Sequence, residues 1–255
     1  MNISVIGFGY WGPNLVRNFK NIKNCNVTHI AESQKERHGR IHELYPDITI
    51  STFDEIIKNS DVDAVVIATH ISSHYELAKA ALENDKHVLV EKPMTSSEKN
   101  AQELIKLSKL KNKILMVDHT YLYSGAVQEI KKSLDANLLG EILYVDSIRA
   151  NLGKFQSDVN VLWDLAPHDI SIINYLINEK PVSVQAFGKS YTKNQLENIA
   201  YLILHYESNK IVHVNCSWIS PIKIRTMIIG GSKKMLVFDD VQQKKIRVYN
   251  KNLDD

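Results

Sequence analysis

The chain has 255 residues, of which 44% are apolar and 24% are charged, and its formal net charge at pH 7 is +2. This is ordinary globular composition, long enough for one large domain or two. The small net charge gives no electrostatic reason to expect nucleic acid or a membrane surface as a partner. The first residue already opens a strand rather than a secretory leader, no apolar run reaches about 18 residues, and Cys25 and Cys216 lie far apart, which together predict a reduced, cytoplasmic protein.

The start of the chain predicts a dinucleotide site. An apolar, β-rich run over residues 3–6 leads into Gly7, Gly9 and Gly12, and a helical pattern follows from Pro13 to about residue 20. In such a G-x-G-x-x-G turn the first glycine makes the tight bend, the second admits a pyrophosphate, and the third lets helix and strand pack closely. The free N–H groups of the helix end then form an anion site. The other loop residues assigned to the cofactor are Phe8, Tyr10 and Trp11.

A second strand over residues 26–30 leads to Glu32, twenty residues past Gly12. A Rossmann unit places the acid that binds the adenosine ribose at about this distance. A carboxylate there favours NAD, because it would repel the 2′-phosphate of NADP; an exposed loop acid is the alternative. Arg37 could cover an adenine face or bind a phosphate, so NADP stays possible, and Ser33 is assigned to the same site.

Strands and helices alternate to about residue 119, which predicts a doubly wound α/β Rossmann domain with a parallel sheet over residues 1–119. The run VDAVVIA at 62–68 is apolar throughout, as expected for a parallel strand covered on both faces. Ligands sit at the carboxyl ends of such strands, so the loop with Thr69, His70 and His74 should pass along the cofactor. The other elements expected are helices over 34–45, 52–58, 75–84 and 97–111 and strands over 48–50, 87–90 and 114–117.

From residue 120 the pattern changes. Short turns between the strands imply a mostly antiparallel sheet, whose apolar face two helices can cover. Residues 120–255 are therefore expected to form an α+β domain for substrate binding and oligomerisation. The helices are expected over 125–137 and 164–177, and the strands over 141–151, 182–189, 198–206, 210–218, 223–230, 234–238 and 245–249.

Two groups of residues suit nicotinamide-dependent oxidation of an alcohol, which needs a base, a donor for the alkoxide-like oxygen and orientation. Lys92 ends a buried strand, where a lysine packs poorly, and Pro93 restricts its backbone and could hold a cis bond. Asp164 and His168 are four residues apart and share a helix face, and a histidine near an acid is a ready general base. The alternatives are a surface lysine, a helix-capping acid and a core histidine.

Other residues are weaker candidates. Arg149 and Asn151 alternate on one strand and could reach a substrate phosphate or hydroxyl, although a solvated pair fits equally well. Tyr121 and Asn160 are further candidates to line a substrate pocket. The His, Cys and carboxylate residues show no convincing metal-ligand spacing, so no metal is expected.

Four segments together resemble the Gfo/Idh/MocA oxidoreductases: GFGYWG at 7–12, ATHISSHYELAKAALENDKHVLVEKPM at 68–94, LLGEILYVDS at 138–147 and DLAPHD at 164–169. The resemblance covers nearly the whole chain. It implies a Rossmann domain followed by a domain with an open, mostly antiparallel sheet, and NAD(P)-dependent oxidation or reduction of sugars and polyols. It also implies that Lys92 is the catalytic lysine and that Asp164 and His168 form the D-x-x-x-H element. Glu91 and Lys92 are also assigned to the cofactor site.

The GYWGPNLVRNF and VNVLWDLAPHDISI stretches are most similar to members that act on nucleotide-linked sugars in surface-polysaccharide pathways, such as UDP-N-acetyl sugar 3-dehydrogenases. The alternatives are an inositol-type polyol dehydrogenase and a non-catalytic sensor of dinucleotide and sugar. A homo-oligomer, dimer or tetramer, is expected through the C-terminal sheet. His70, Asp118 and Ala166 depart from the family's usual residues, and the sequence stops at Asp255, earlier than in its relatives, so a native C-terminal part is expected to be absent or the chain is a short member.

Overall fold

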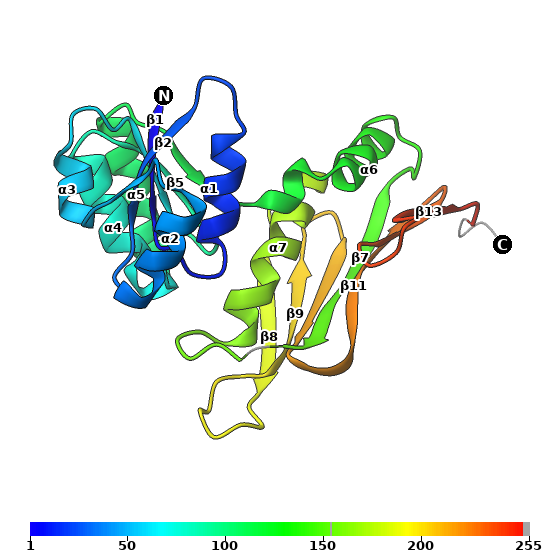
Figure 1. Cartoon of the computed structure of the whole chain (residues 1–255). Helices are drawn as coiled ribbons and strands as arrows, with labels where there is room; N and C mark the ends of the chain where they lie inside the picture. The colour runs from blue at the N-terminus through cyan, green and yellow to red at the C-terminus, as the bar shows by residue number, and fades with distance from the viewer. Residues whose placement is uncertain (154, 252–255) are drawn as a thin grey trace. The chain divides into compact units, whose positions relative to one another are not determined.

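The computed structural model describes residues 1–153 and 155–251. The chain divides into two compact units, Met1–Asp118 and His119–Asp255. Each unit has one sheet with helices packed against it (Figure 1). The fold class expected from the sequence, a Rossmann domain followed by an α+β domain, is confirmed.

The first unit is built on a six-stranded sheet with the order β3-β2-β1-β4-β5-β6. All of its neighbouring strands pair in parallel. The strands are β1 (Asn2–Ile6), β2 (Asn26–Ala31), β3 (Thr49–Ile50), β4 (Ala64–Ile67), β5 (His87–Val90) and β6 (Leu115–Val117). The helices are α1 (Gly12–Lys20), η1 (Lys35–Arg37), α2 (His38–Leu44), α3 (Phe53–Lys58), α4 (Ile71–Glu83) and α5 (Glu98–Leu110).

Helices cover both faces of this sheet. Along β4, Val65 and Ile67 belong to the apolar cluster that includes Leu82 of α4 and Leu104 of α5. The alternate residue Val66 belongs to a second cluster, with residues of α1 and α2. Because successive side chains of a strand point to opposite faces, a strand buried on both sides must be apolar throughout, and β4 is.

The second unit is built on a seven-stranded sheet with the order β13-β12-β11-β7-β10-β9-β8. Its neighbours are antiparallel except for the parallel pair of β10 and β7. The strands are β7 (Ile142–Leu152), β8 (Ser183–Lys189), β9 (Ile199–His205), β10 (Ile211–Ser217), β11 (Ile219–Gly231), β12 (Met235–Asp239) and β13 (Ile246–Tyr249). The helices are η2 (Thr120–Tyr123), α6 (Gly125–Asp135) and α7 (Val161–Leu176).

The helices of the second unit pack against one face of its sheet. Val127 and Ile130 of α6 and Ile172 of α7 are buried in one cluster with strand residues such as Val145 and Val214. On β8 every residue is exposed, and Phe187 of β8 lies opposite the exposed Tyr201 of β9. An apolar face therefore remains uncovered within the described part of this unit.

Four expected elements differ from the observed ones in type or by three or more residues at one end. The helix expected over 75–84 begins at Ile71, so His74 lies within α4 rather than in the loop before it. The helix expected from residue 34 starts as the tighter turn η1, closed by a 3.0 Å bond from the Arg37 N–H to the Gln34 carbonyl, as helix starts often are. Helix α7 begins three residues earlier than expected, because the Asn160 side chain caps it, and Pro167 lies within it. Strand β11 also begins earlier, and its pairing with β7 is irregular between Ile219 and Ile224, where Pro221 has no N–H to donate.

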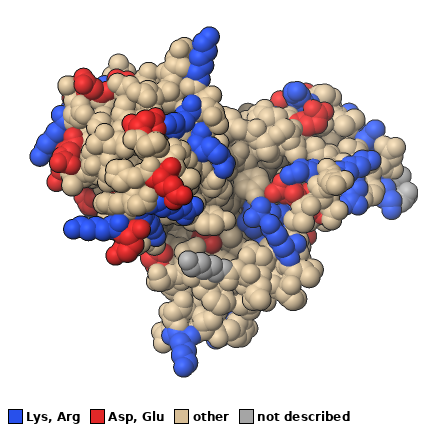
Figure 2. All heavy atoms as spheres, viewed as in Figure 1, with Lys and Arg blue, Asp and Glu red and all other residues tan. Residues whose placement is uncertain are grey.

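Within the described residues, every helix is too short or too polar to span a bilayer. On the face drawn in Figure 2, basic and acidic side chains are interspersed rather than gathered by sign. This distribution agrees with the small net charge.

Candidate functional site

The glycine loop between β1 and α1 has the shape that its motif predicts. Gly7 has a φ of +95°, and a Cβ there would lie 2.6 Å from the Ala68 carbonyl oxygen. A Cβ on Gly12 would lie 2.2 Å from the Gly7 carbonyl oxygen, so helix and strand could not pack as closely. At Gly9 the nearest atom to such a Cβ is the Arg37 Nη1, 3.7 Å away. Gly7 and Gly12 therefore have no room for a side chain, whereas the backbone at Gly9 is open to the approach of a ligand.

The start of α1 is suited to an anion. Trp11 at its N-cap makes no side-chain capping bond, the first turn holds no acidic residue, and Pro13 lies at the helix start. The N–H groups and positive dipole end of the helix are therefore not satisfied by a side chain of the cap. Tyr10 and Trp11 beside them are exposed, with their rings packed edge to face. These residues fit the pyrophosphate of a dinucleotide.

Glu32 is a buried carboxylate that supports the glycine loop. Its Oε2 accepts the Phe8 N–H at 2.8 Å and the Arg37 Nη1 at 3.0 Å, and its Oε1 accepts the Gln34 N–H at 2.8 Å. Burial would raise the pKa of Glu32, but the two backbone N–H groups and Arg37 hold it below its usual value. The alternative of an exposed loop acid is wrong, since the side chain is 4% exposed. Ser33 follows in an exposed bend.

His74 joins the loops that follow β4 and β5. Its imidazole is almost wholly buried and lies 2.9 Å from the Pro93 carbonyl oxygen through Nδ1 and 3.1 Å from the Thr69 carbonyl oxygen through Nε2. In the same turn the hydroxyls of Thr69 and Ser73 share a 2.7 Å bond, and Ser73 also donates to the His70 carbonyl. The histidine that the sequence assigns to the cofactor site thus also braces the segment after Lys92.

Lys92 lies two residues past the end of β5, and its peptide bond to Pro93 is cis. The residue before it, Glu91, is buried and donates its N–H to the Ile67 carbonyl. Burial and the neighbouring carboxylate of Asp118 raise the pKa of Glu91 to about 7. The register between β5 and β6 explains this proximity, because Asp118 and Glu91 follow strand ends that pair directly.

In the second unit, Asp164 and His168 both lie within α7, one turn apart on one helix face. Asn160 accepts the Trp163 N–H at 3.2 Å as the helix cap and donates to Glu197 at 2.9 Å. Asp164 accepts a bond of 3.1 Å from the indole of the buried Trp218. An acid in the first turn is also favoured by the helix dipole.

Arg149 is buried rather than solvated. Its Nε and Nη2 donate to the Asp169 carboxylate at 2.6 and 3.0 Å, and its Nη1 donates to the Tyr121 hydroxyl at 3.2 Å. Burial alone would lower the pKa of Arg149, but the facing Asp169 carboxylate raises it. Asn151 lies on the same strand face and is half-buried. The solvated pair considered for Arg149 and Asn151 is therefore wrong, and a contact of either with substrate stays a prediction.

Tyr121 and Arg149 belong to a larger polar network, because the Arg225 Nη1 donates to the Tyr121 hydroxyl at 2.9 Å and that hydroxyl donates to the Asp240 Oδ2 at 3.3 Å. Sequence reasoning did not select Asp169, Arg225 or Asp240 as site residues. Asp169 directly follows His168, so its place beside a candidate site was visible in the sequence. Its pairing with Arg149 on strand β7 was not visible there. Arg225 and Asp240 gave no local signal, because they reach the network through the pairing of β11 with β7 and β12.

The predicted residues thus form two groups, one in each unit. The glycine loop, Glu32, Arg37, His74 and the segment around Lys92 belong to the first, and the face of α7 with His168 belongs to the second. Their action on one substrate stays a prediction. Within residues 1–153 and 155–251, no group of three or more His, Cys, Asp or Glu side chains is arranged to hold a metal ion, and the expectation of no metal also stays a prediction.

Family models match both units. Residues 1–119 match the oxidoreductase family with an NAD-binding Rossmann fold, and residues 127–237 match the GFO/IDH/MocA C-terminal domain. An uncharacterized oxidoreductase of Escherichia coli, YhhX, is 36% identical over 58% of this chain and 43% of its own length. An inositol 2-dehydrogenase/D-chiro-inositol 3-dehydrogenase of Shouchella clausii is 24% identical over 94% of this chain and 72% of its own.

The UDP-N-acetylglucosamine 3-dehydrogenase of Acidithiobacillus ferrooxidans is 28% identical over 74% of this chain and 58% of its own length. A solved structure of that enzyme superposes with a TM-score of 0.87 at 23% identity, covering 98% of this chain and 80% of the other. The chain spans about half the length of several curated relatives that it matches. With one family's models matching both of its units, the chain belongs to the GFO/IDH/MocA oxidoreductases and carries their NAD-binding Rossmann fold.

Proposed function

We propose that this protein transfers hydride between a hydroxyl-bearing carbon of a sugar, carried on a nucleotide, and the nicotinamide of NAD. The observation that carries the proposal is the segment after β5. There a lysine follows a buried strand of the NAD-binding unit, and His74 braces the carbonyl of the next residue. A lysine in that place is poorly explained by packing and well explained by chemistry at the carboxyl ends of the strands.

In the proposed reaction, His168 accepts the proton of the substrate hydroxyl and Lys92 stabilises the negative charge that develops on the oxygen. Asp164 orients this pair or supports its charge. Its position one helical turn before His168 supports that role. The bound nicotinamide supplies the hydride acceptor.

The nucleotide-linked substrate is favoured by the similarity to the UDP-N-acetylglucosamine 3-dehydrogenase. A place in polysaccharide biosynthesis belongs to this proposal. The inositol dehydrogenases are the second candidate, because their similarity extends over more of this chain. A sensor that binds dinucleotide and sugar without turnover is the third, and the presence of both Lys92 and His168 speaks against it.

The test is reduction of NAD+ or NADP+ by the purified protein with UDP-N-acetylglucosamine, its uronic acid or myo-inositol, followed by absorbance of the reduced nicotinamide. We expect turnover with a UDP-sugar. Lys92→Ala and His168→Asn should abolish it while leaving NAD binding intact. The control is Lys99→Ala, on the exposed surface of α5. Retained turnover in Lys92→Ala contradicts the assignment, and NAD binding with no turnover in the unaltered protein supports a sensor.

We propose NAD rather than NADP as the preferred cofactor. Glu32 is ionised, and a carboxylate at this position opposes a 2′-phosphate. Arg37 partly offsets that charge. Glu32→Gln should therefore lower the ratio of NAD affinity to NADP affinity, measured by titration of each dinucleotide. An unchanged ratio would show that Glu32 does not set the preference.

We also propose that the uncovered sheet face of the second unit joins two copies of the chain. Phe187, Tyr201 and Ile211 are apolar or aromatic and exposed on strands β8, β9 and β10. An apolar sheet face of this kind is typical of an interface. Sedimentation should give a dimer or tetramer, and Tyr201→Lys should give a monomer.

We also propose a cytoplasmic location, which the two free thiols of Cys25 and Cys216 support.

A further inference from the structure

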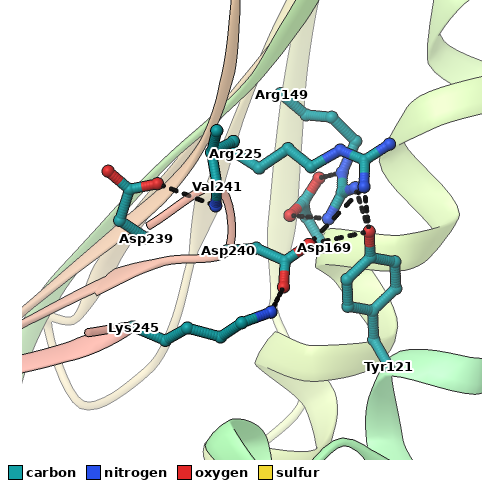
Figure 3. A network of polar contacts seen from close by, with 8 residues as sticks. All are labelled: Tyr121, Arg149, Asp169, Arg225, Asp239, Asp240, Val241 and Lys245. Carbon is teal, nitrogen blue, oxygen red and sulfur yellow. Dashed lines mark hydrogen bonds and ion pairs between the residues drawn. The ribbon is translucent and has the colours of Figure 1, made fainter. Parts of the chain in front are cut away.

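The hydroxyl of Tyr121 is the centre of a polar network in the second unit (Figure 3). It accepts hydrogen bonds from the Arg149 Nη1 at 3.2 Å and from the Arg225 Nη1 at 2.9 Å, and it donates to the Asp240 Oδ2 at 3.3 Å. Lys245 in turn donates to the other oxygen of Asp240 at 2.6 Å. A hydroxyl can donate one hydrogen bond and accept two, and the Tyr121 hydroxyl makes all three.

The ring of Tyr121 also contacts two neighbouring side chains. The guanidinium carbon of Arg149 lies over the ring, 4.6 Å from its centroid. The ring also contacts the His168 imidazole, with centroids 5.0 Å apart and planes inclined by 68°. Tyr121 thus contacts both a fixed cation and the histidine that the sequence selects as the base.

The cation is itself fixed. Arg149 on β7 and Asp169 on α7 make a two-pronged ion pair in which the side chains are 4% and 6% exposed. Two parallel bonds of this kind define one relative orientation of the groups. Because Asp169 directly follows His168, the pair fastens α7 to β7 at the residue next to the imidazole.

We propose that Tyr121 is a positioning residue, which, held by Arg149, Arg225 and Asp240, sets the orientation of the His168 imidazole. The inference rests on the proposed function only in that His168 is taken to act on the substrate. A substrate contact by Tyr121, which the sequence also allows, is the competing role. The fully used hydroxyl argues against it.

The first arm of the test needs no substrate. The full chain is labelled in its histidine rings, the His168 signals are assigned with His168→Gln, and their shift and width are followed by NMR. Tyr121→Phe keeps the ring beside His168 but removes the hydroxyl, and Tyr121→Leu removes both. We expect the His168 signals to shift and broaden in Tyr121→Phe, and to do so more strongly in Tyr121→Leu. Tyr175→Phe is the matched control. Tyr175 lies on the same helix as His168, α7, but its hydroxyl donates to Gln128 and takes no part in the Tyr121 network.

The second arm measures turnover. A misplaced base lowers kcat, so Tyr121→Phe should lose about tenfold in kcat with KM nearly unchanged, and Tyr121→Leu more. His168 signals that stay unchanged in both variants overturn the proposal. A raised KM at unchanged kcat also overturns it, in favour of a substrate contact. If His168→Asn keeps full turnover, the role of His168 as the base fails, and if the unaltered protein shows no turnover, the proposed function fails. In either case the NMR arm still decides whether Tyr121 orients His168.

Discussion

Glu91 links the stability of the first unit to pH. Its carboxyl is buried beside Asp118, and both effects raise its pKa to about 7 from an ordinary 4.5. In the unfolded chain the group is ionised above about pH 4.5, whereas in the folded chain it keeps its proton until about pH 7. The folded state therefore binds more protons within this window, and the free energy of unfolding falls as the pH rises through it.

The size of the effect follows from the two values. A difference of about 2.5 pKa units corresponds to about 3 kcal/mol of stabilisation, which is fully present below about pH 4.5 and fully lost above about pH 7. Glutamine at this position is neutral at every pH. Glu91→Gln should therefore change stability little at about pH 4.5 and raise it by up to about 3 kcal/mol at about pH 8, relative to the unaltered chain.

The assay is urea unfolding without cofactor, followed by circular dichroism at several pH values between these limits. The control is Glu76→Gln, an exposed acid on α4, whose stability difference should not depend on pH. If the curves of Glu91→Gln and of the unaltered chain run parallel to within about 1 kcal/mol, the buried acid is not the source of the pH dependence. A second measurement, the titration of the labelled Glu91 carboxyl carbon by NMR, then gives its pKa directly.

Three further predictions concern packing and buried polar contacts. Gly12→Ala places a Cβ 2.2 Å from the Gly7 carbonyl oxygen, so NAD affinity measured by titration should fall at least about tenfold. Asp169→Ala leaves Arg149 buried without its carboxylate and should cost about 3–5 kcal/mol in urea unfolding, whereas Arg149→Met with Asp169→Leu should cost far less. The ammonium of the buried Lys86 donates to the part-buried Asn59 carbonyl at 2.6 Å and to the buried Val62 carbonyl at 2.7 Å. Lys86→Met removes both bonds and should cost about 1–3 kcal/mol in urea unfolding, and an unchanged stability would contradict this expectation.

The fold could be predicted because its signals are local. The run over 62–68 is apolar at every position, and only a strand covered on both faces needs that pattern. The glycines of the first loop have fixed roles in a turn between strand and helix, and the structure assigns each a matching environment. The short turns of the second unit predict antiparallel neighbours, although not the parallel pairing of β10 with β7.

The candidate site could be predicted only in part, because the hydrogen bonds that hold its side chains join residues far apart in the sequence. Tyr121 and Asp240 are 119 positions apart in the sequence, and Arg149 and Asp169 come from a strand and a helix that no local pattern brings together. Arg149 looked like a substrate ligand because it alternates with Asn151 on a strand. The pattern places it on the correct face, but it does not reveal that an acid on α7 already occupies its donors.

A buried ion pair is weak evidence for stability, since well-packed apolar residues of similar size often stabilise as much or more. The Arg149–Asp169 pair therefore needs a reason other than stability, and geometry supplies one. Apolar contacts between α7 and β7 tolerate small slides of the helix, whereas two parallel hydrogen bonds of 2.6 and 3.0 Å do not. A helix that slides by a fraction of a turn keeps its core but moves His168. Under the proposal that His168 must be held in one orientation, the pair contributes by fixing that one degree of freedom.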